Sequence, residues 1–140
     1  MSIIRPDSRP LYILVKEKID EKIDGEYIGI INYSVMSLIQ LELGTADNDK
    51  DISKKRAEEL FVEHFKASKA LMENKNHDYS EAWRNMRRES LTDIILMKLL
   101  RIKQIEDNEK KKKISEGVDA NYRDIINYAV FALIKLEENN

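Results

Sequence analysis

The stretch VDANYRDIINYAVFALIKLE, residues 118–137, occurs a second time in the chain as IDGEYIGIINYSVMSLIQLE, residues 23–42. With a shift of 95 positions, 11 of the 20 aligned pairs are identical. The identical pairs are Asp24/Asp119, Tyr27/Tyr122, Ile30/Ile125, Ile31/Ile126, Asn32/Asn127, Tyr33/Tyr128, Val35/Val130, Leu38/Leu133, Ile39/Ile134, Leu41/Leu136 and Glu42/Glu137. A repeat of this density indicates one supersecondary unit that is used twice.

The repeat predicts how the chain is organised. We expect a single all-α domain over residues 1–140, with a degenerate first repeat at about residues 8–44 and a fuller second repeat at about residues 52–138. The two repeat helices should pack in one core about a pseudo-twofold axis, with Tyr33 and Tyr128 in equivalent environments.

The composition favours long helices and a soluble protein. The chain has 140 residues, 42% hydrophobic and 36% charged, which is enough for one core and too short for two ordinary domains. Only four glycines and two prolines are present, and both prolines fall in the first ten residues. The remainder therefore has few forced helix breaks.

Other classes of protein are disfavoured by the same composition. The absence of cysteine excludes disulfides and thiolate metal sites and fits a reducing cytoplasm. A net charge of −2 gives no indication of direct binding to nucleic acid or to an anionic membrane. No apolar run approaches the roughly 18–20 residues of a membrane span, and the N-terminus lacks the apolar core of a signal peptide.

The spacing of apolar residues predicts five main helices with short connections. Gly44 is expected to end the second helix, and Ser53 or Asp51 to cap the third. Ser90-Leu-Thr-Asp93 is a capping-box pattern for the fourth, and Asp119 is a suitable N-cap for the fifth. The expected helices are about Leu11–Ile19, Glu26–Leu43, Lys54–Glu73, Leu91–Glu106 and Ala120–Glu138, with a short helical piece at Glu81–Met86.

The polar segment at residues 74–80 interrupts this periodicity and is predicted to be a turn. It contains a mixture of side chains that suits a nucleotide: cations for phosphate, amides and acids for a ribose or base edge, and aromatic rings for stacking. The alternative is an ordinary Asn-rich turn followed by one anchoring tryptophan. The residues concerned are Lys75, Asn76, His77, Asp78 and Tyr79, with Trp83 and Arg84 nearby.

Two further groups could take part in chemistry. Lys98 and Arg101 lie three residues apart, hence on one side of a helix, where they could bind a polyphosphate or be ordinary surface charges. Glu116, Asp119 and Asp124 surround the start of the last helix, with Asn127 three residues beyond Asp124.

Carboxylate and amide oxygens are ligands for a hard cation such as Mg²⁺. The alternative is that these acids cap the helix or favour its positive end. Asn127 is preserved as Asn32 in the first copy although Gly29 replaces Asp124 there, which indicates a structural task such as an interhelical hydrogen bond, at least in the first copy. Asp93 is a weaker candidate, because it has a capping explanation.

Three motifs together resemble a known family. They are Lys75-Asn-His-Asp-Tyr79 with Ala82-Trp83, then Ser90-Leu-Thr-Asp93 with Lys98 and Arg101-Ile102, and finally Glu116 with Asp124-Ile-Ile-Asn127-Tyr128. In this order they are similar to nucleotide modification associated domain 1, a bacterial and phage family that itself resembles the MazG-like all-α NTP pyrophosphatases. The likeness covers about residues 54–138 throughout and the first half only from about Ser8.

The first copy departs from the family pattern. No Lys-Asn-x-Asp-Tyr segment precedes it, and Gly29 stands in place of the acid. Two-copy members commonly begin with that segment, so the resemblance implies a truncated or naturally reduced first copy.

The resemblance implies an α-helical bundle that uses Mg²⁺, or alternatively Mn²⁺, to hydrolyse the α–β bond of a (d)NTP or a modified dNTP. Glu116 and Asp124 would be catalytic; they would hold the metal with Asp119, Asn127 and Asp93. Lys98 and Arg101 would bind the phosphates, and residues 75–79 with Trp83 would line the nucleoside. The rival hypothesis is a non-catalytic helical interaction module. A homodimer is compatible with either, and we expect one nucleotide cleft per chain, in the second half.

Overall fold

The computed structural model of the protein describes residues 21–44, 52–79, 81–108 and 115–138. Within these ranges the chain forms four α-helices and one 3-10 helix, with no strand, which confirms the predicted all-α class. The elements are α2 (Glu21–Leu43), α3 (Lys54–Tyr79), η2 (Ala82–Asn85), α4 (Arg88–Asn108) and α5 (Ser115–Glu138). The predicted helix at Leu11–Ile19 lies outside the described residues.

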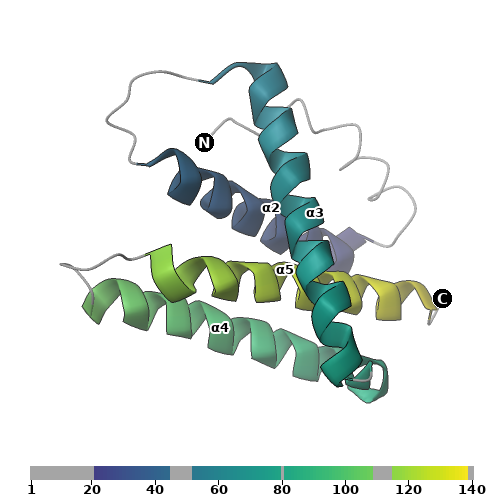
Figure 1. The fold of residues 1–140 in the computed structure, drawn as a ribbon. Coiled ribbons are helices and arrows are strands. Elements are labelled where there is room, and N and C mark those ends of the chain that lie inside the picture. The colour runs from purple at the N-terminus through teal and green to yellow at the C-terminus, as the bar shows by residue number, and fades with distance from the viewer. Residues whose placement is uncertain (1–20, 45–51, 80, 109–114, 139–140) are drawn as a thin grey trace.

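Helix α5 lies at the centre of the arrangement (Figure 1). Helices α2 and α4 run alongside it in the opposite direction, and α3 crosses both α2 and α5. The short η2 connects the end of α3 to α4 and also contacts α5. Every other described element therefore touches α5, and its apolar residues must face several neighbours.

The two copies of the repeat supply most of the buried core. The identical pairs Tyr27/Tyr122 and Ile31/Ile126 are buried in both copies. α3 and α4 complete the core mainly with Leu60, Leu91, Ile95 and Ile102. The repeat contributes Tyr27, Ile31, Val35, Leu38 and Ile39 from α2 and Val118, Tyr122, Ile125, Ile126, Ala129, Phe131 and Ala132 from α5. The prediction that the two repeat helices share one core is confirmed.

The equivalence of Tyr33 and Tyr128 is not confirmed. Tyr33 is 58% exposed, whereas Tyr128 is partly buried against the core. The Tyr128 ring meets Phe131 edge to face, with centroids 5.9 Å apart. The first copy has Met36 at the position of Phe131, so this aromatic contact has no counterpart there.

Two predicted helix ends are confirmed. α2 ends at Leu43, and Gly44 follows with a φ of +88°, a left-handed conformation that glycine adopts without steric cost. The N–H of Gly44 donates to the carbonyl of Gln40. At the start of α3, the hydroxyl oxygen of Ser53 accepts a hydrogen bond of 3.0 Å from the N–H of Arg56, so Ser53 is the N-cap.

Four other boundaries were predicted wrongly. α2 begins at Glu21 rather than at about Glu26. α3 continues through residues 74–79, because Asn and Asp each weaken a helix by less than about 1 kcal/mol and no glycine or proline intervenes. The break comes at Glu81, which has a φ of +56°. α4 begins at Arg88 rather than behind Ser90, and α5 begins at Ser115, before Asp119. Packing of the fully buried Leu91 and Val118 overrides these local capping patterns.

A polar network joins α3 to both repeat helices. Nε2 of His64 lies 2.7 Å from a carboxylate oxygen of Glu42 at the end of α2. Arg123 of α5 approaches Nδ1 of His64 at 3.3 Å and the His64 carbonyl at 3.3 Å. Because arginine can only donate, Nδ1 accepts and Nε2–H donates to Glu42. One imidazole of fixed tautomer thus joins three helices, α2, α3 and α5.

The second contact of α5 with α3 is buried. The amide nitrogen of Asn127 donates to the carbonyl of Ser68 at 3.0 Å, and both residues are buried. The Ser68 hydroxyl in turn donates to the His64 carbonyl at 2.9 Å. The interhelical hydrogen bond that was expected at least for Asn32 in the first copy is thus present at Asn127 in the second copy.

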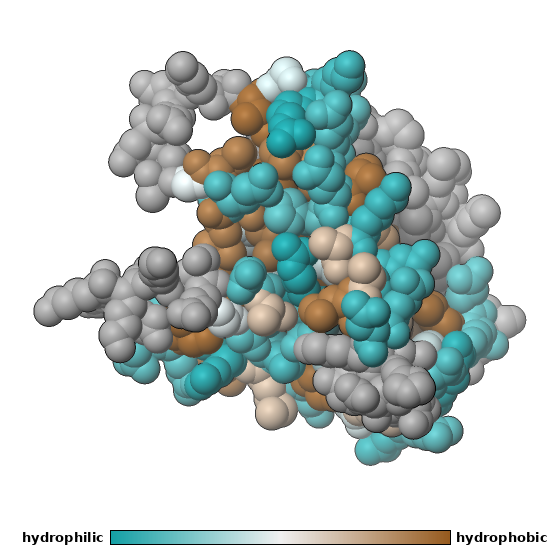
Figure 2. Space-filling view, in the orientation of Figure 1, coloured by the Kyte–Doolittle hydropathy of each residue, from teal (hydrophilic) through white to brown (hydrophobic). Residues whose placement is uncertain are grey.

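The surface follows from this packing. Figure 2 shows hydrophilic residues along the outer side of α3 and hydrophobic residues where α3 meets α2. None of the described helices is sufficiently long and apolar to cross a membrane.

Replacement of Asn127 by alanine should destabilise the protein by about 1–3 kcal/mol, because a buried hydrogen bond to α3 is lost. The free energy of unfolding measured by urea denaturation checks this. Asn74→Ala is the matched control, since Asn74 is exposed on α3 and its replacement should change stability by no more than about 0.5 kcal/mol. Equal effects of the two substitutions would contradict the structural role of Asn127.

Stability should also fall at alkaline pH through Tyr122. Burial raises the pKa of the Tyr122 hydroxyl, and its hydrogen bond with Ser37 opposes that rise. Tyr122 is neutral in both states below the unfolded pKa of about 10, so its full contribution is present there and is lost as pH rises through the higher folded value. Tyr122→Phe should flatten the fall in unfolding free energy between neutral and strongly alkaline pH. Parallel curves for the two proteins would contradict this.

Candidate functional site

One predicted pair of charges meets in the structure. Lys98 of α4 places its Nζ 3.1 Å from Oδ2 of Asp124 on α5. The two side chains are 32% and 22% exposed, so the pair lies at the boundary between the helix interface and solvent. An ion pair in such a place is screened less than one on the open surface. A candidate phosphate-binding cation and a candidate metal-binding acid therefore lie in direct contact.

The position of Lys98 along α4 is unusual for a lysine. The buried residues Leu91, Ile95 and Ile102 form the row of α4 that faces the core. Lys98 and Leu99 both lie at three-to-four-residue steps between Ile95 and Ile102; Leu99 packs against the core, while Lys98 lies at the other edge of the row and is 32% exposed. A packed apolar side chain would commonly stabilise such a position at least as well as an ion pair. Packing alone therefore does not require a lysine at this position.

Arg101 extends the positive charge toward solvent. It lies three residues beyond Lys98, on the same side of α4, and its side chain is exposed. The two cations thus differ in setting: Lys98 is held against Asp124, and Arg101 lies at the open edge. An anion with several charged groups could contact both.

The other predicted acids are arranged differently. Asp93 is exposed and lies five residues from Lys98, about 140° further around the helix. Asp119 is exposed, and its Oδ1 accepts a hydrogen bond from the N–H of Ala120 at 2.8 Å. The side chain of Glu116 is outside the described set. Of the described candidate acids, Asp124 alone is held beside a candidate cation.

Asp124 and Asn127 face different neighbours. Asp124 contacts α4 through Lys98, while Asn127 contacts α3 through the Ser68 carbonyl. The two residues lie one helical turn apart, but the Asn127 amide binds α3 and does not join Asp124 at the Lys98 contact. The described part of the chain contains no group of three or more His, Cys, Asp or Glu residues that could hold a metal ion.

Trp83 packs inside the fold, as the alternative of an ordinary turn followed by an anchoring tryptophan expects. Its ring is buried and stacks on Phe131 with centroids 4.4 Å apart and an angle of 3° between the planes. The guanidinium of Arg84 lies 4.4 Å from the same ring. The ring is thus engaged within the fold rather than presented to a base. The side chains of residues 75–79 lie outside the described set, on the last turns of α3.

Two groups of polar contacts were not predicted. His64 has no visible partner in the sequence, because Glu42 and Arg123 lie 22 and 59 residues away. The Tyr27 hydroxyl lies within hydrogen-bonding distance of Thr92 and also accepts a hydrogen bond from Arg88 at 3.5 Å, and so links α2 to the first turns of α4. The preserved pair Tyr27/Tyr122 was the only available indication that Tyr27 is structurally important.

Comparison with known proteins gives one family. A family model described as nucleotide modification associated domain 1 matches residues 9–41 and 75–136. No curated protein and no solved structure matches the chain. The matched segments contain nearly all of α2, η2, α4 and α5, including Lys98 and Asp124, and leave out most of α3. Since they make up well over half of its length, the chain belongs to the nucleotide modification associated domain 1 family.

Proposed function

We propose that the protein binds a nucleoside triphosphate, a (d)NTP or a modified dNTP, together with Mg²⁺, at the Lys98–Asp124 pair. The observation that carries this proposal is a lysine in a core-facing row of α4, held 3.1 Å from a carboxylate on α5. Packing does not require this pair, whereas a triphosphate with its metal requires both charges. Membership of a family associated with nucleotide modification supports the same class of ligand.

The donor set fits a metal that arrives with its nucleotide. Among the described residues Asp124 supplies one partly buried carboxylate, and no cluster of three ligands exists to hold a bare ion. Mg²⁺ commonly binds through one or two carboxylates plus phosphate oxygens and water, and Mn²⁺ accepts similar ligands. When bound, the metal would neutralise phosphate charge and lower the pKa of a coordinated water.

Different residues of the chain would bind different parts of the ligand. Lys98 would bind a phosphate oxygen and Asp124 the metal, so each would exchange its present partner for another of the same charge sign. Arg101, at the exposed edge, would bind the outer phosphates. Because the ion pair already holds Lys98 and Asp124 together, little side-chain ordering remains for binding. Glu116 and Asp119 would support the metal, and Lys75–Tyr79 the nucleoside.

We propose further that the bound nucleotide is hydrolysed between the α and β phosphates. The water oxygen bonds to phosphorus, the bridging bond breaks, and a nucleoside monophosphate and pyrophosphate are released. The likeness of the motifs to the MazG-like all-α NTP pyrophosphatases supports this reaction class, with Asp124 and Glu116 as the catalytic acids.

A non-catalytic interaction module is the second candidate function. It is favoured by the exposed apolar residues Leu96, Met97 and Leu100 on α4. Such a module predicts no binding of nucleotide, with or without Mg²⁺, so titration separates the two functions.

Isothermal titration should detect binding of a dNTP in the presence of Mg²⁺ and no heat with Mg²⁺ alone. Lys98→Met and Asp124→Asn should each weaken the binding by at least about tenfold, which corresponds to about 1.4 kcal/mol. Each should change the free energy of unfolding by only about 1 kcal/mol or less, because the pair is partly solvated.

The matched control is the exposed ion pair of Arg56 and Glu59 on α3, with a separation of 3.3 Å. Arg56→Met and Glu59→Gln should leave nucleotide binding unchanged. Wild-type affinity in Lys98→Met would refute the proposed phosphate contact. A large loss of stability with unchanged affinity in Asp124→Asn would make Asp124 a structural residue.

A nucleotide panel assayed for pyrophosphate release should show turnover with Mg²⁺, and Asp124→Asn should reduce the rate by on the order of 10²-fold or more. The monophosphate product, measured by chromatography, should form in a one-to-one ratio with pyrophosphate. Release of inorganic phosphate instead would assign cleavage to the β–γ bond. Tight binding without any product across the panel would contradict hydrolysis while leaving the binding proposal intact.

A further inference from the structure

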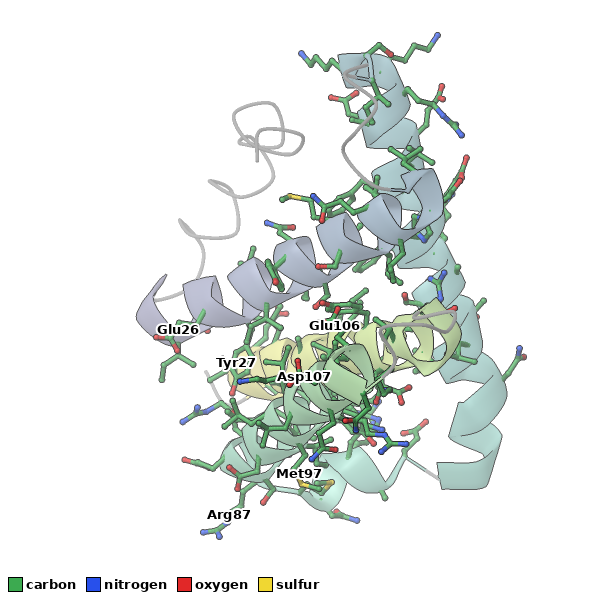
Figure 3. The ribbon with its side chains drawn as sticks, turned by 90° about the vertical axis from the view of Figure 1, so that its left-hand side faces the viewer. Glu26, Tyr27, Arg87, Met97, Glu106 and Asp107 are labelled. Atoms are coloured by element: carbon green, nitrogen blue, oxygen red, sulfur yellow. The ribbon has the colours of Figure 1, made fainter. Side chains whose placement is uncertain are left out.

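The side of α4 that faces away from the core is apolar at its middle. Leu96, Met97 and Leu100 are 53%, 66% and 60% exposed. Figure 3 shows Met97 on α4 directed away from the rest of the bundle. We call these three residues the α4 outer patch. Exposed large apolar residues scattered singly are common, but three within five positions on one helix side are a candidate contact surface.

The described elements leave the outer patch uncovered. α4 packs on α5 through the row that contains Leu91, Ile95 and Ile102, on the opposite side of the helix. In Figure 1, α4 forms the edge of the arrangement, with α5 on its inner side. Leu96 and Leu100 each lie about 160° around the helix from Lys98. A partner could therefore reach the patch without disturbing the bundle.

The charged residues beside the patch allow two copies related by a twofold rotation to place opposite charges together. Asp93 and Lys103 are both exposed, and each lies five residues from Lys98, one before it and one after it. Leu96 and Leu100 each lie two residues from Lys98. If two α4 helices cross antiparallel at that level, Leu96 meets Leu100 of the second copy. The long side chain of Lys103 then reaches Asp93 of the second copy, and the contact occurs twice.

The same charged residues disfavour a parallel helix pair and a contact with an anionic lipid surface. A parallel pairing would place Asp93 opposite Asp93 and Lys103 opposite Lys103. An anionic lipid surface would face the exposed acids Glu89, Asp93 and Asp107. In the antiparallel crossing Glu89 of one copy lies at the same end of the contact as Asp107 of the second copy. Packed helices cross at about 20–50°, so those ends diverge and the two acids separate.

We propose that the α4 outer patch is a homodimer interface in which two copies of the chain pack antiparallel through α4. The contact is confined to about three helical turns, smaller than a standard interface of about 1,600 Å², so the dimer dissociates at micromolar concentration. The proposal does not depend on nucleotide binding, because Lys98 and its partner Asp124 meet between α4 and α5, on the side of α4 away from the outer patch.

Sedimentation velocity and light scattering over about 1–100 μM test this. Wild type should shift from monomer to dimer across the range, and Met97→Glu and Leu100→Glu should each raise the dissociation constant at least about tenfold. Val62→Glu is the matched control, since Val62 is 47% exposed on α3 and its replacement should leave association unchanged. Wild type that stays monomeric throughout, or loses its dimer equally in Val62→Glu, overturns the proposal.

Charge reversal tests the antiparallel arrangement itself. Asp93→Lys and Lys103→Asp should each weaken self-association, because each homodimer then contains two like-charge contacts. An equimolar mixture of the two variants should recover dimer at close to the wild-type concentration, since the mixed pair restores both opposite-charge contacts. A mixture that associates no better than the separate variants overturns the antiparallel pairing.

Discussion

The packing of α5 against three helices is the interaction on which the other features depend. α2, α3 and α4 all contact α5, and most of the fully buried side chains belong to α5 or to its repeat partner α2. A helix surrounded in this way cannot be amphipathic in the usual sense, because it has little free side. Its polar residues must therefore be accommodated at particular interfaces: Asn127 and Arg123 toward α3, and Asp124 toward α4.

The polar residues of α5 therefore have two different roles, depending on which helix they face. Toward α3, the amide and guanidinium groups bind backbone carbonyls and a histidine, which fixes the crossing of the two helices. Toward α4, a carboxylate meets a lysine at a place where an apolar pair would also pack. The first set is explained by the fold. The second joins two ionised side chains at the edge of the α4–α5 interface, where the proposed nucleotide would bind, so the two sets differ in whether the polar group satisfies the backbone or another ionised side chain.

The fold was predictable wherever the repeat or a turn residue carried the information. The identical pairs Tyr27/Tyr122 and Ile31/Ile126 marked buried faces of α2 and α5, and Gly44 and Ser53 marked helix ends. Local capping patterns at Ser90 and Asp119 failed, since burial of neighbouring residues determined where those helices begin. In the candidate site, the contacts of the predicted residues could not be read from the sequence. Spacing placed Asp124 and Asn127 on one side of a helix and could not indicate that they serve different neighbours.

The junction between η2 and the end of α5 has a consequence for how the bundle opens. Lys135 donates to the Arg84 carbonyl at 2.8 Å, Arg84 pairs with Glu138, and Trp83 stacks on Phe131. These contacts tie the segment before α4 to the last turns of α5, so the α4–α5 hairpin is closed at the end opposite its loop. Such a closed hairpin opens as a cooperative unit rather than by fraying from one end. Amides near the C-terminus of α5 would then exchange with solvent as slowly as those in the middle of α4.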